Sequence, residues 1–111
     1  MIRVGVFGAG GRMGSTVCRA VHDAADLELV AAVDPFHAGI DLAQLGVKDA
    51  HLTVAAGPDA LTDARAQVAV DFTVLDAARE NLRWCAANAV HAVVGTTGFS
   101  EAELAEYADL F

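Results

Sequence analysis

The segment VGVFGAGGRMG, from Val4 to Gly14, decides the fold of this 111-residue chain. Its apolar start predicts a buried strand, its glycines predict a tight turn, and the residues that follow have the apolar spacing of a helix. Glycines in such a turn let main-chain N–H groups approach a diphosphate, and the positive end of the helix dipole adds attraction. The segment therefore predicts a pyrophosphate cradle, although a tight strand-to-helix connection alone would also use these glycines. They are Gly8, Gly10, Gly11 and Gly14.

Asp34 ends a second apolar run, Leu27 to Val33. An acidic residue at the end of the second strand of a dinucleotide site accepts hydrogen bonds from the hydroxyls of the adenine ribose. The alternative is that Asp34 only starts a turn with Pro35, since Asp-Pro favours turns. A carboxylate at this position repels a 2′-phosphate, so the sequence favours NADH over NADPH. The only nearby cationic candidates are His37 and Arg12.

Apolar runs and amphipathic segments alternate along the rest of the chain, without a repeat or a linker. Near-continuous apolar strands are typical of parallel sheets that are covered on both faces. We therefore expect one domain, residues 1–111, with an α/β fold: a Rossmann-like, doubly wound parallel sheet of about five strands in three layers. The expected strands are 3–7, 27–34, 52–56, 68–72 and 91–95, and the expected helices are 11–25, 58–66, 75–89 and 100–110, with a short turn at 41–45.

Four segments that are distant in sequence are expected to meet in this fold. Right-handed crossovers place the carboxyl end of every parallel strand at the same edge of the sheet, where ligands bind. The residues expected at this edge are Gly8, Asp34, Thr73 and Gly95 to Gly98.

Composition excludes several other classes of protein. The net charge is −8, which argues against binding to nucleic acid or to an anionic membrane, and no apolar run is long enough to span a membrane. The start of the chain lacks the pattern of a secretion signal, so a cytoplasmic location is expected. Cys18 and Cys85 have no C-x-x-C spacing, and we expect reduced, buried thiols, with a disulfide as the alternative. The four histidines form no cluster with metal-ligand spacing, so we expect no metal site.

Three motifs together resemble the N-terminal domain of the dihydrodipicolinate reductases, the 4-hydroxy-tetrahydrodipicolinate reductases of bacterial lysine and diaminopimelate biosynthesis. They are GAGGRMG at 8–14, VDFT at 70–73 and HAVVGTTGF at 91–99. The resemblance implies that Asp34 contacts the ribose, and that Thr97 also touches a carboxylate of the substrate through its backbone. The residues implied at the pyrophosphate are Gly8, Ala9, Gly10, Gly11, Arg12 and Met13, and those implied beside the nicotinamide are Gly95, Thr96 and Thr97.

The resemblance also implies an activity. The family reduces a small cyclic dicarboxylate by hydride transfer from NADH or NADPH, and the parent enzyme is expected to be a homotetramer, while this domain alone is expected to be a monomer. In the family a substrate-binding domain, which holds the acid and base residues, follows the nucleotide-binding domain, and nothing in this chain corresponds to it. We therefore expect this chain to bind cofactor without turnover and to contain no catalytic residue.

Other interpretations remain open from the sequence. The chain could be a free-standing NAD(H)-binding or sensing module, or a structural domain that no longer binds nucleotide. A homoserine or aspartate-semialdehyde dehydrogenase fits the GTTGF motif less well. A plain tight turn would also use the residues Gly95 to Gly98. Asp71 and Thr73 are expected to act as helix caps or among backbone donors rather than in chemistry.

Overall fold

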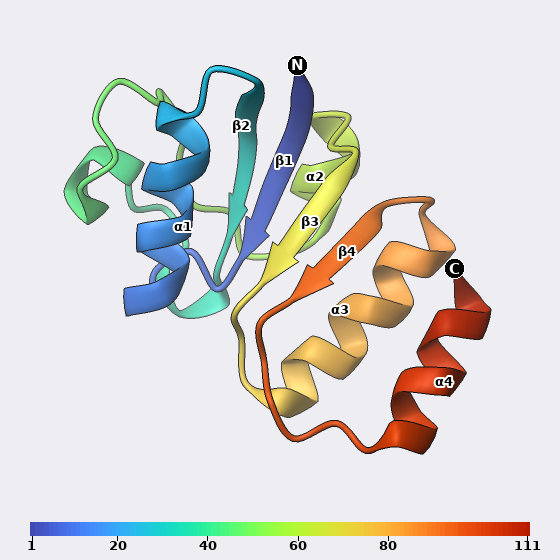
Figure 1. The fold of residues 1–111 in the computed structure, drawn as a ribbon. Helices are drawn as coiled ribbons and strands as arrows, with labels where there is room; N and C mark the ends of the chain where they lie inside the picture. Colours follow the sequence, from blue (N-terminus) through green and yellow to red (C-terminus); the bar gives the residue numbers. More distant parts are fainter.

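The computed structural model describes residues 1–111 and has a four-stranded, fully parallel sheet at its centre (Figure 1). The strand order is β2-β1-β3-β4, so the chain starts in the middle of the sheet and extends it in both directions. This arrangement confirms the predicted α/β, Rossmann-like fold. The strands are β1 (Ile2–Phe7), β2 (Leu27–Val33), β3 (Val68–Asp71) and β4 (His91–Val94).

Helices cover both faces of the sheet and make the predicted three layers. On one face, Val4 and Val6 of β1 pack into the same apolar cluster as Cys18 of α1. On the other face, Phe7 shares a cluster with Leu61 of α2 and with Cys85 of α3, while α4 packs against α3. The helices are α1 (Arg12–Asp23), α2 (Asp59–Asp63), α3 (Leu75–Ala87) and α4 (Glu101–Leu110), and two short 3-10 helices are η1 (Pro35–His37) and η2 (Leu42–Leu45).

The prediction of a strand at 52–56 is wrong, because this segment forms only isolated bridges. Ala55 makes a single parallel bridge to Val33, and Thr53 makes a single antiparallel bridge to Asp41. Because this short segment divides its pairing between β2 and the loop before η2, neither ladder extends further. The sheet therefore has four strands where the sequence predicted about five. The helix predicted at 58–66 is also shorter, and the chain leaves helical geometry at Arg65, whose φ is 58°.

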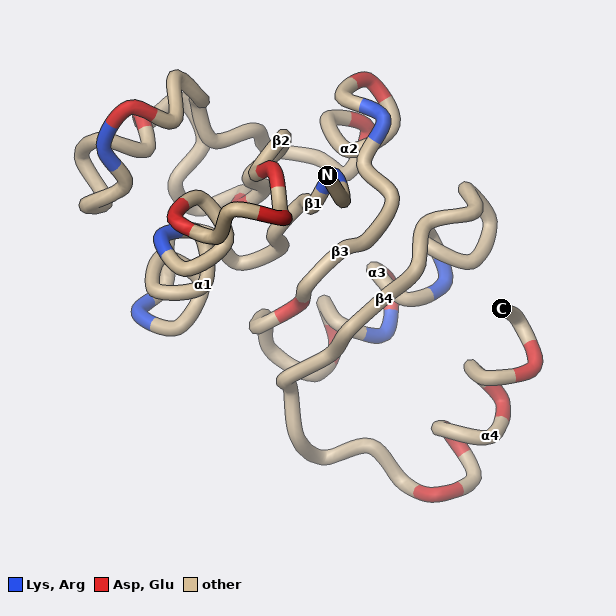
Figure 2. The backbone as a smooth tube through the Cα atoms, turned by 45° about the horizontal axis from the view of Figure 1, so that its top comes forward, with Lys and Arg blue, Asp and Glu red and all other residues tan.

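Charged residues are scattered over the molecule instead of gathering into a basic face. Figure 2 shows Lys and Arg spread over several elements, whereas Asp and Glu recur along α4. None of the helices is both long and apolar enough to span a membrane. All four strands end at the same edge of the sheet, at the lower side of Figure 1, and the residues that follow them converge there as predicted.

Candidate nucleotide-binding site

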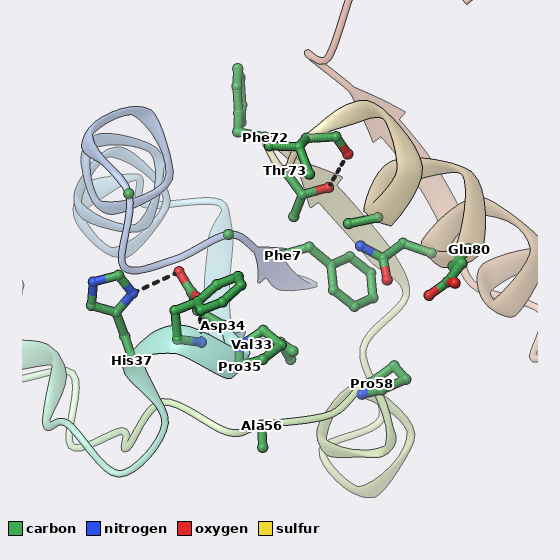
Figure 3. A pocket seen from close by; sticks show the side chains of 16 residues that line it. Phe7, Val33, Asp34, Pro35, His37, Ala56, Pro58, Phe72, Thr73 and Glu80 are labelled. Carbon is green, nitrogen blue, oxygen red and sulfur yellow. Dashed lines mark hydrogen bonds and ion pairs between the residues drawn. The ribbon is translucent and has the colours of Figure 1, made fainter.

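The carboxyl edge of the sheet contains a hollow of about 440 Å³, a volume in the range of small-molecule sites. Figure 3 shows its walls: the turn after β1 and the end of β2 on one side, and the start of α3 on the other. Gly8, Gly11 and Asp34 of the predicted site lie in the first wall, and Thr73 lies in the second.

The turn after β1 requires glycine at two positions. Gly8 has a φ of 80°, which side chains rarely adopt, and its N–H donates to the carbonyl of Val33 at 2.8 Å. Gly14, in the first turn of α1, lies so close to the Gly8 carbonyl that a Cβ there would overlap it. Gly11 is different, because a Cβ there would lie 3.4 Å from the Gly8 oxygen, at ordinary contact distance.

The N–H groups of this turn fall into two sets. Those of Gly8 and Ala9 donate to Val33, that of Gly10 donates to Asp34, and that of Gly11 donates to Gly8. The next N–H groups belong to the first turn of α1, where a helix supplies no acceptor. An anion at this turn would therefore meet the first turn of the helix, with its positive dipole end, rather than the N–H groups of Gly8 to Gly11. The N–H groups without an acceptor are those of Arg12, Met13 and Gly14, of which Arg12 and Met13 are exposed and Gly14 is buried.

Asp34 is 6% exposed, and both of its carboxylate oxygens are occupied. One oxygen accepts from the N–H of Gly10 and the other from the N–H of Phe36, each at 3.0 Å. Asp34 therefore caps η1 beside Pro35, so the turn role left open by the sequence is present. The bond to Gly10 attaches the end of β2 to the glycine turn. A ribose would have to lie beside this junction.

His37 covers this part of the hollow. Its Nδ1 lies 3.1 Å from an Asp34 oxygen, at ion-pair distance but not aligned as a hydrogen bond (Figure 3). The imidazole also packs against Gly10, where a Cβ would overlap the ring. A ribose that approaches Asp34 would therefore contact or displace His37.

A second hollow of about 410 Å³ begins where the first one ends. The two hollows share the wall formed by Phe72, Thr73 and Val74. The second hollow adds the predicted residues of the GTT turn, and the ring of Phe72 lies against Gly95. Its residues contain no ionisable side chain, and they are Met13, Phe72, Thr73, Val74, Leu75, Gly95, Thr96 and Thr97.

A buried carboxylate orders the wall between the hollows. Asp71 is 2% exposed and accepts from the N–H and the hydroxyl of Thr73, at 2.8 and 2.6 Å, and from the amide of Asn81 at 2.9 Å. The expected structural role of Asp71 is thus confirmed, with one backbone donor and two side-chain donors. The prediction that Thr73 caps α3 is wrong, since the N-cap is Val74 and no side chain caps this helix. The hydroxyl of Thr73 bonds Asp71 instead.

The structure groups most of the predicted residues, with three exceptions. Ala9 is fully buried beneath the turn, Gly10 lies under His37, and Arg12 is exposed and lines neither hollow. Sequence reasoning missed Phe72 and Asn81 as lining residues. Phe72 directly precedes Thr73 in the VDFT motif, and this adjacency was the available signal, whereas nothing in the sequence marked Asn81 on α3.

Neither cysteine contributes to the site. Both are free and buried, on opposite faces of the sheet, which excludes the alternative of a disulfide between them in this structure. Burial raises the pKa of the Cys18 thiol and that of the Cys85 thiol to about 12. No group of three His, Cys, Asp or Glu side chains is arranged to hold a metal ion.

A family profile and the sequences of known proteins place this chain in the same family. The sequence profile described as "Dihydrodipicolinate reductase, N-terminus" matches residues 2–111. The chain is 44% identical over 101 residues to 4-hydroxy-tetrahydrodipicolinate reductase of Cutibacterium acnes, a match that covers 91% of this chain and 32% of that protein. It is 47% identical over 106 residues to the enzyme of the same name from Thermobifida fusca, which covers 96% of this chain and 35% of that protein. The chain thus spans about a third of the length of these relatives.

Solved structures agree with this result. Dihydrodipicolinate reductase of Paenisporosarcina sp. TG-14, solved with dipicolinate bound, superposes with a TM-score of 0.78 and 30% identity, over 99% of this chain and 43% of that one. An aspartate-semialdehyde dehydrogenase of Candida albicans superposes with a TM-score of 0.71 at 14% identity, which is a likeness of fold alone.

Proposed function

This chain belongs to the dihydrodipicolinate reductase family, in which it matches the N-terminal domain, and we propose that its 111 residues form the dinucleotide-binding domain of a 4-hydroxy-tetrahydrodipicolinate reductase. The observation that carries this proposal is the pair of connected hollows along the carboxyl edge of the sheet. Two hollows that share a wall suit an elongated ligand with two separate ring systems, such as a dinucleotide.

The residues present fit such a cofactor along its length. The adenosine half would lie beside Asp34, and the pyrophosphate would lie over the open side of Gly11, against the free N–H groups of α1. Arg12, exposed at the start of that helix, supplies the nearest positive charge. The nicotinamide would lie in the second hollow, against Gly95, Thr96 and Thr97. We also propose that the cofactor contacts the backbone of Gly8, Ala9, Gly10 and Met13.

The choice between NADH and NADPH follows from charge. The buried carboxylate of Asp34 would face the ribose, and a 2′-phosphate at that place would be repelled. His37 is the only basic side chain in the hollow, and its Nδ1 already lies 3.1 Å from an Asp34 oxygen. We therefore propose that NADH binds more tightly than NADPH.

The proposed reaction is a hydride transfer from the reduced nicotinamide to a small cyclic dicarboxylate. Thr97, which is exposed at the GTT turn, would offer its backbone to a substrate carboxylate. The second hollow contains no ionisable side chain that could donate the accompanying proton. A substrate must also be held close to the nicotinamide and partly desolvated. We therefore propose that this chain alone binds cofactor without turnover. We also propose that its parent is a cytoplasmic homotetramer and that the isolated domain is a monomer.

Calorimetric titration with NADH tests the proposal, with a matched pair of variants. Asp34 and Asp41 each cap a 3-10 helix by accepting from a backbone N–H two residues on, but only Asp34 lines the hollow. Asp34→Ala should weaken NADH binding by about 1 to 2 kcal/mol, the scale of a hydrogen bond to a charged acceptor, whereas Asp41→Ala should leave the affinity unchanged. Failure of the folded parent chain to bind NADH would contradict the proposal.

A further inference from the structure

The hydroxyl proton of Thr96 is used in a hydrogen bond within the protein. It donates to the carbonyl oxygen of Thr73 at 2.7 Å, across the gap between the GTT turn and the turn after β3. A threonine hydroxyl has one proton and two acceptor lone pairs. While this bond is intact, Thr96 therefore offers only lone pairs to a ligand in the second hollow.

The partner of this bond is held firmly. The N–H and the hydroxyl of Thr73 both bond Asp71, which is buried and also accepts from Asn81 of α3. The Thr73 carbonyl is therefore fixed to the sheet and to α3 at the same time. The Thr73 hydroxyl donates its own proton to Asp71, so it does not act as a donor to the Thr96 oxygen. The network gives the Thr96 hydroxyl one preferred direction before any ligand arrives.

The apolar side chains around Thr96 strengthen its selectivity as a hydrogen-bond acceptor. Four apolar side chains surround it, from Met13, Phe72, Val74 and Leu75, and of these Met13 and Val74 are exposed until a ring bound in the hollow covers them and excludes water. Hydrogen bonds are stronger where water is partly excluded, and an unpaired polar group costs more there. An acceptor at this place therefore discriminates between ligands that bring an N–H donor and ligands of the same shape that do not.

We propose that Thr96, held by its bond to the Thr73 carbonyl, is an acceptor-only group that selects the amino half of the nicotinamide carboxamide. The proposal rests on the proposed function, since it assigns the nicotinamide to the second hollow. It goes beyond that function because it states which end of the carboxamide faces Thr96. It also predicts that an analogue with a methyl group in place of the amino group binds less well.

The test compares NADH with its reduced 3-acetylpyridine analogue, in which a methyl ketone replaces the carboxamide, and ADP-ribose serves as a ligand without the nicotinamide ring. Calorimetry on the parent chain should give NADH an affinity about three to ten times that for the analogue. Thr96→Val keeps the shape of the side chain but removes the acceptor, and should make the two affinities equal. Thr96→Ser should restore the preference for NADH.

Thr62→Val is the matched control. The Thr62 hydroxyl also donates to a backbone carbonyl, that of Asp59, but it lies at the opposite edge of the sheet, near the starts of the strands. This variant should keep the preference for NADH, and ADP-ribose should bind the parent chain and both Thr96 variants alike. A general loss of structure would change the affinity for ADP-ribose as well, which separates it from a local effect on the carboxamide.

Three results would overturn the proposal. If the parent chain binds both dinucleotides equally, or if Thr96→Val retains the preference, Thr96 does not select the amino group, while the proposed function stands. If the folded parent chain binds neither NADH nor ADP-ribose, the proposed function fails, and this inference fails with it.

Discussion

Replacing Gly11 and Gly14 by alanine, one at a time, should separate cofactor binding from folding. The two glycines are three residues apart at the start of α1, and both belong to the predicted cradle. A Cβ on Gly11 would enter the hollow, 3.4 Å from the Gly8 oxygen. A Cβ on Gly14 would overlap the Gly8 carbonyl oxygen, with its carbon 2.6 Å away.

The expected cost of Gly14→Ala follows from two opposing contributions. Alanine is favoured over glycine in a helix by about 1 kcal/mol. Against this, the obstructing atoms are backbone, and Gly8 is anchored by its 2.8 Å hydrogen bond to Val33, so the strain lies at the upper end of the range for overpacking, about 3 kcal/mol. The net loss of about 2 kcal/mol lowers the melting temperature of a domain of this size by roughly 10 °C.

Gly11→Ala should leave stability within about 1 kcal/mol of the parent. The residue is the N-cap of α1 with a φ of −76°, which alanine adopts freely, and the small loss of capping is offset by the lower entropy of the unfolded chain. NADH binding should nevertheless fall at least about tenfold, because the new methyl group would cover the open N–H groups of the helix.

Thermal unfolding followed by circular dichroism, together with calorimetric titration of NADH, measures both effects on each variant. The expected results are a stable Gly11→Ala protein that binds NADH poorly and a Gly14→Ala protein that melts early. A Gly14→Ala protein that melts with the parent chain would refute the contact argument. An unchanged NADH affinity in Gly11→Ala would remove the first turn of α1 from the cofactor site.

Three further predictions concern other parts of the molecule. Asp34→Ala should lower the free energy of unfolding by about 2 to 4 kcal/mol in urea titrations, because two backbone N–H groups lose their acceptor. Cys18 and Cys85 should react very slowly with a thiol reagent at pH 8, since burial raises the pKa of each to about 12, and both should react at once when urea unfolds the chain. Hydrogen bonds from Arg79 lower the pKa of Glu103, so the stabilisation they give α4 is present above the ordinary glutamate pKa of about 4.3 and is lost as the pH falls through the lowered value. The protection factors of the α4 amides, corrected for the intrinsic exchange rate at each pH, should therefore fall on acidification, and Glu103→Gln should already show the lower protection at pH 7.

The sequence predicted the architecture well because its signals were local. The strand-turn-helix pattern around Gly8 and the apolar strands each depend on neighbouring residues, and the carboxyl edge follows from the handedness of crossovers. The segment 52–56 was misread as a strand for the same reason. Its pattern is strand-like, but Thr53 and Ala55 pair with different partners, and no local signal records which partner a residue meets.

The details of the site depend on contacts that sequence reasoning does not reach. The positions of Asp34 and Thr96 at the edge were predictable, but the pairing of Asp34 with Gly10 and of Thr96 with Thr73 joins residues more than twenty apart in the chain. The sequence predicts that Thr73 caps a helix, because threonine is a common N-cap residue. The buried carboxylate of Asp71 competes for the same hydroxyl and takes it.

The two buried carboxylates of the edge explain how an acidic chain could hold an anionic cofactor. The carboxylate oxygens of Asp34 and Asp71 accept hydrogen bonds from donors of the chain itself, at the ends of β2 and β3. Their negative charge is thus partly balanced by fixed N–H and O–H dipoles, and it orders the turns on either side of the hollow. What remains open toward the pyrophosphate is the amino end of α1, whose unpaired N–H groups and dipole are positive. The attraction is therefore local and directional, and it does not require the net charge of −8 to be reversed.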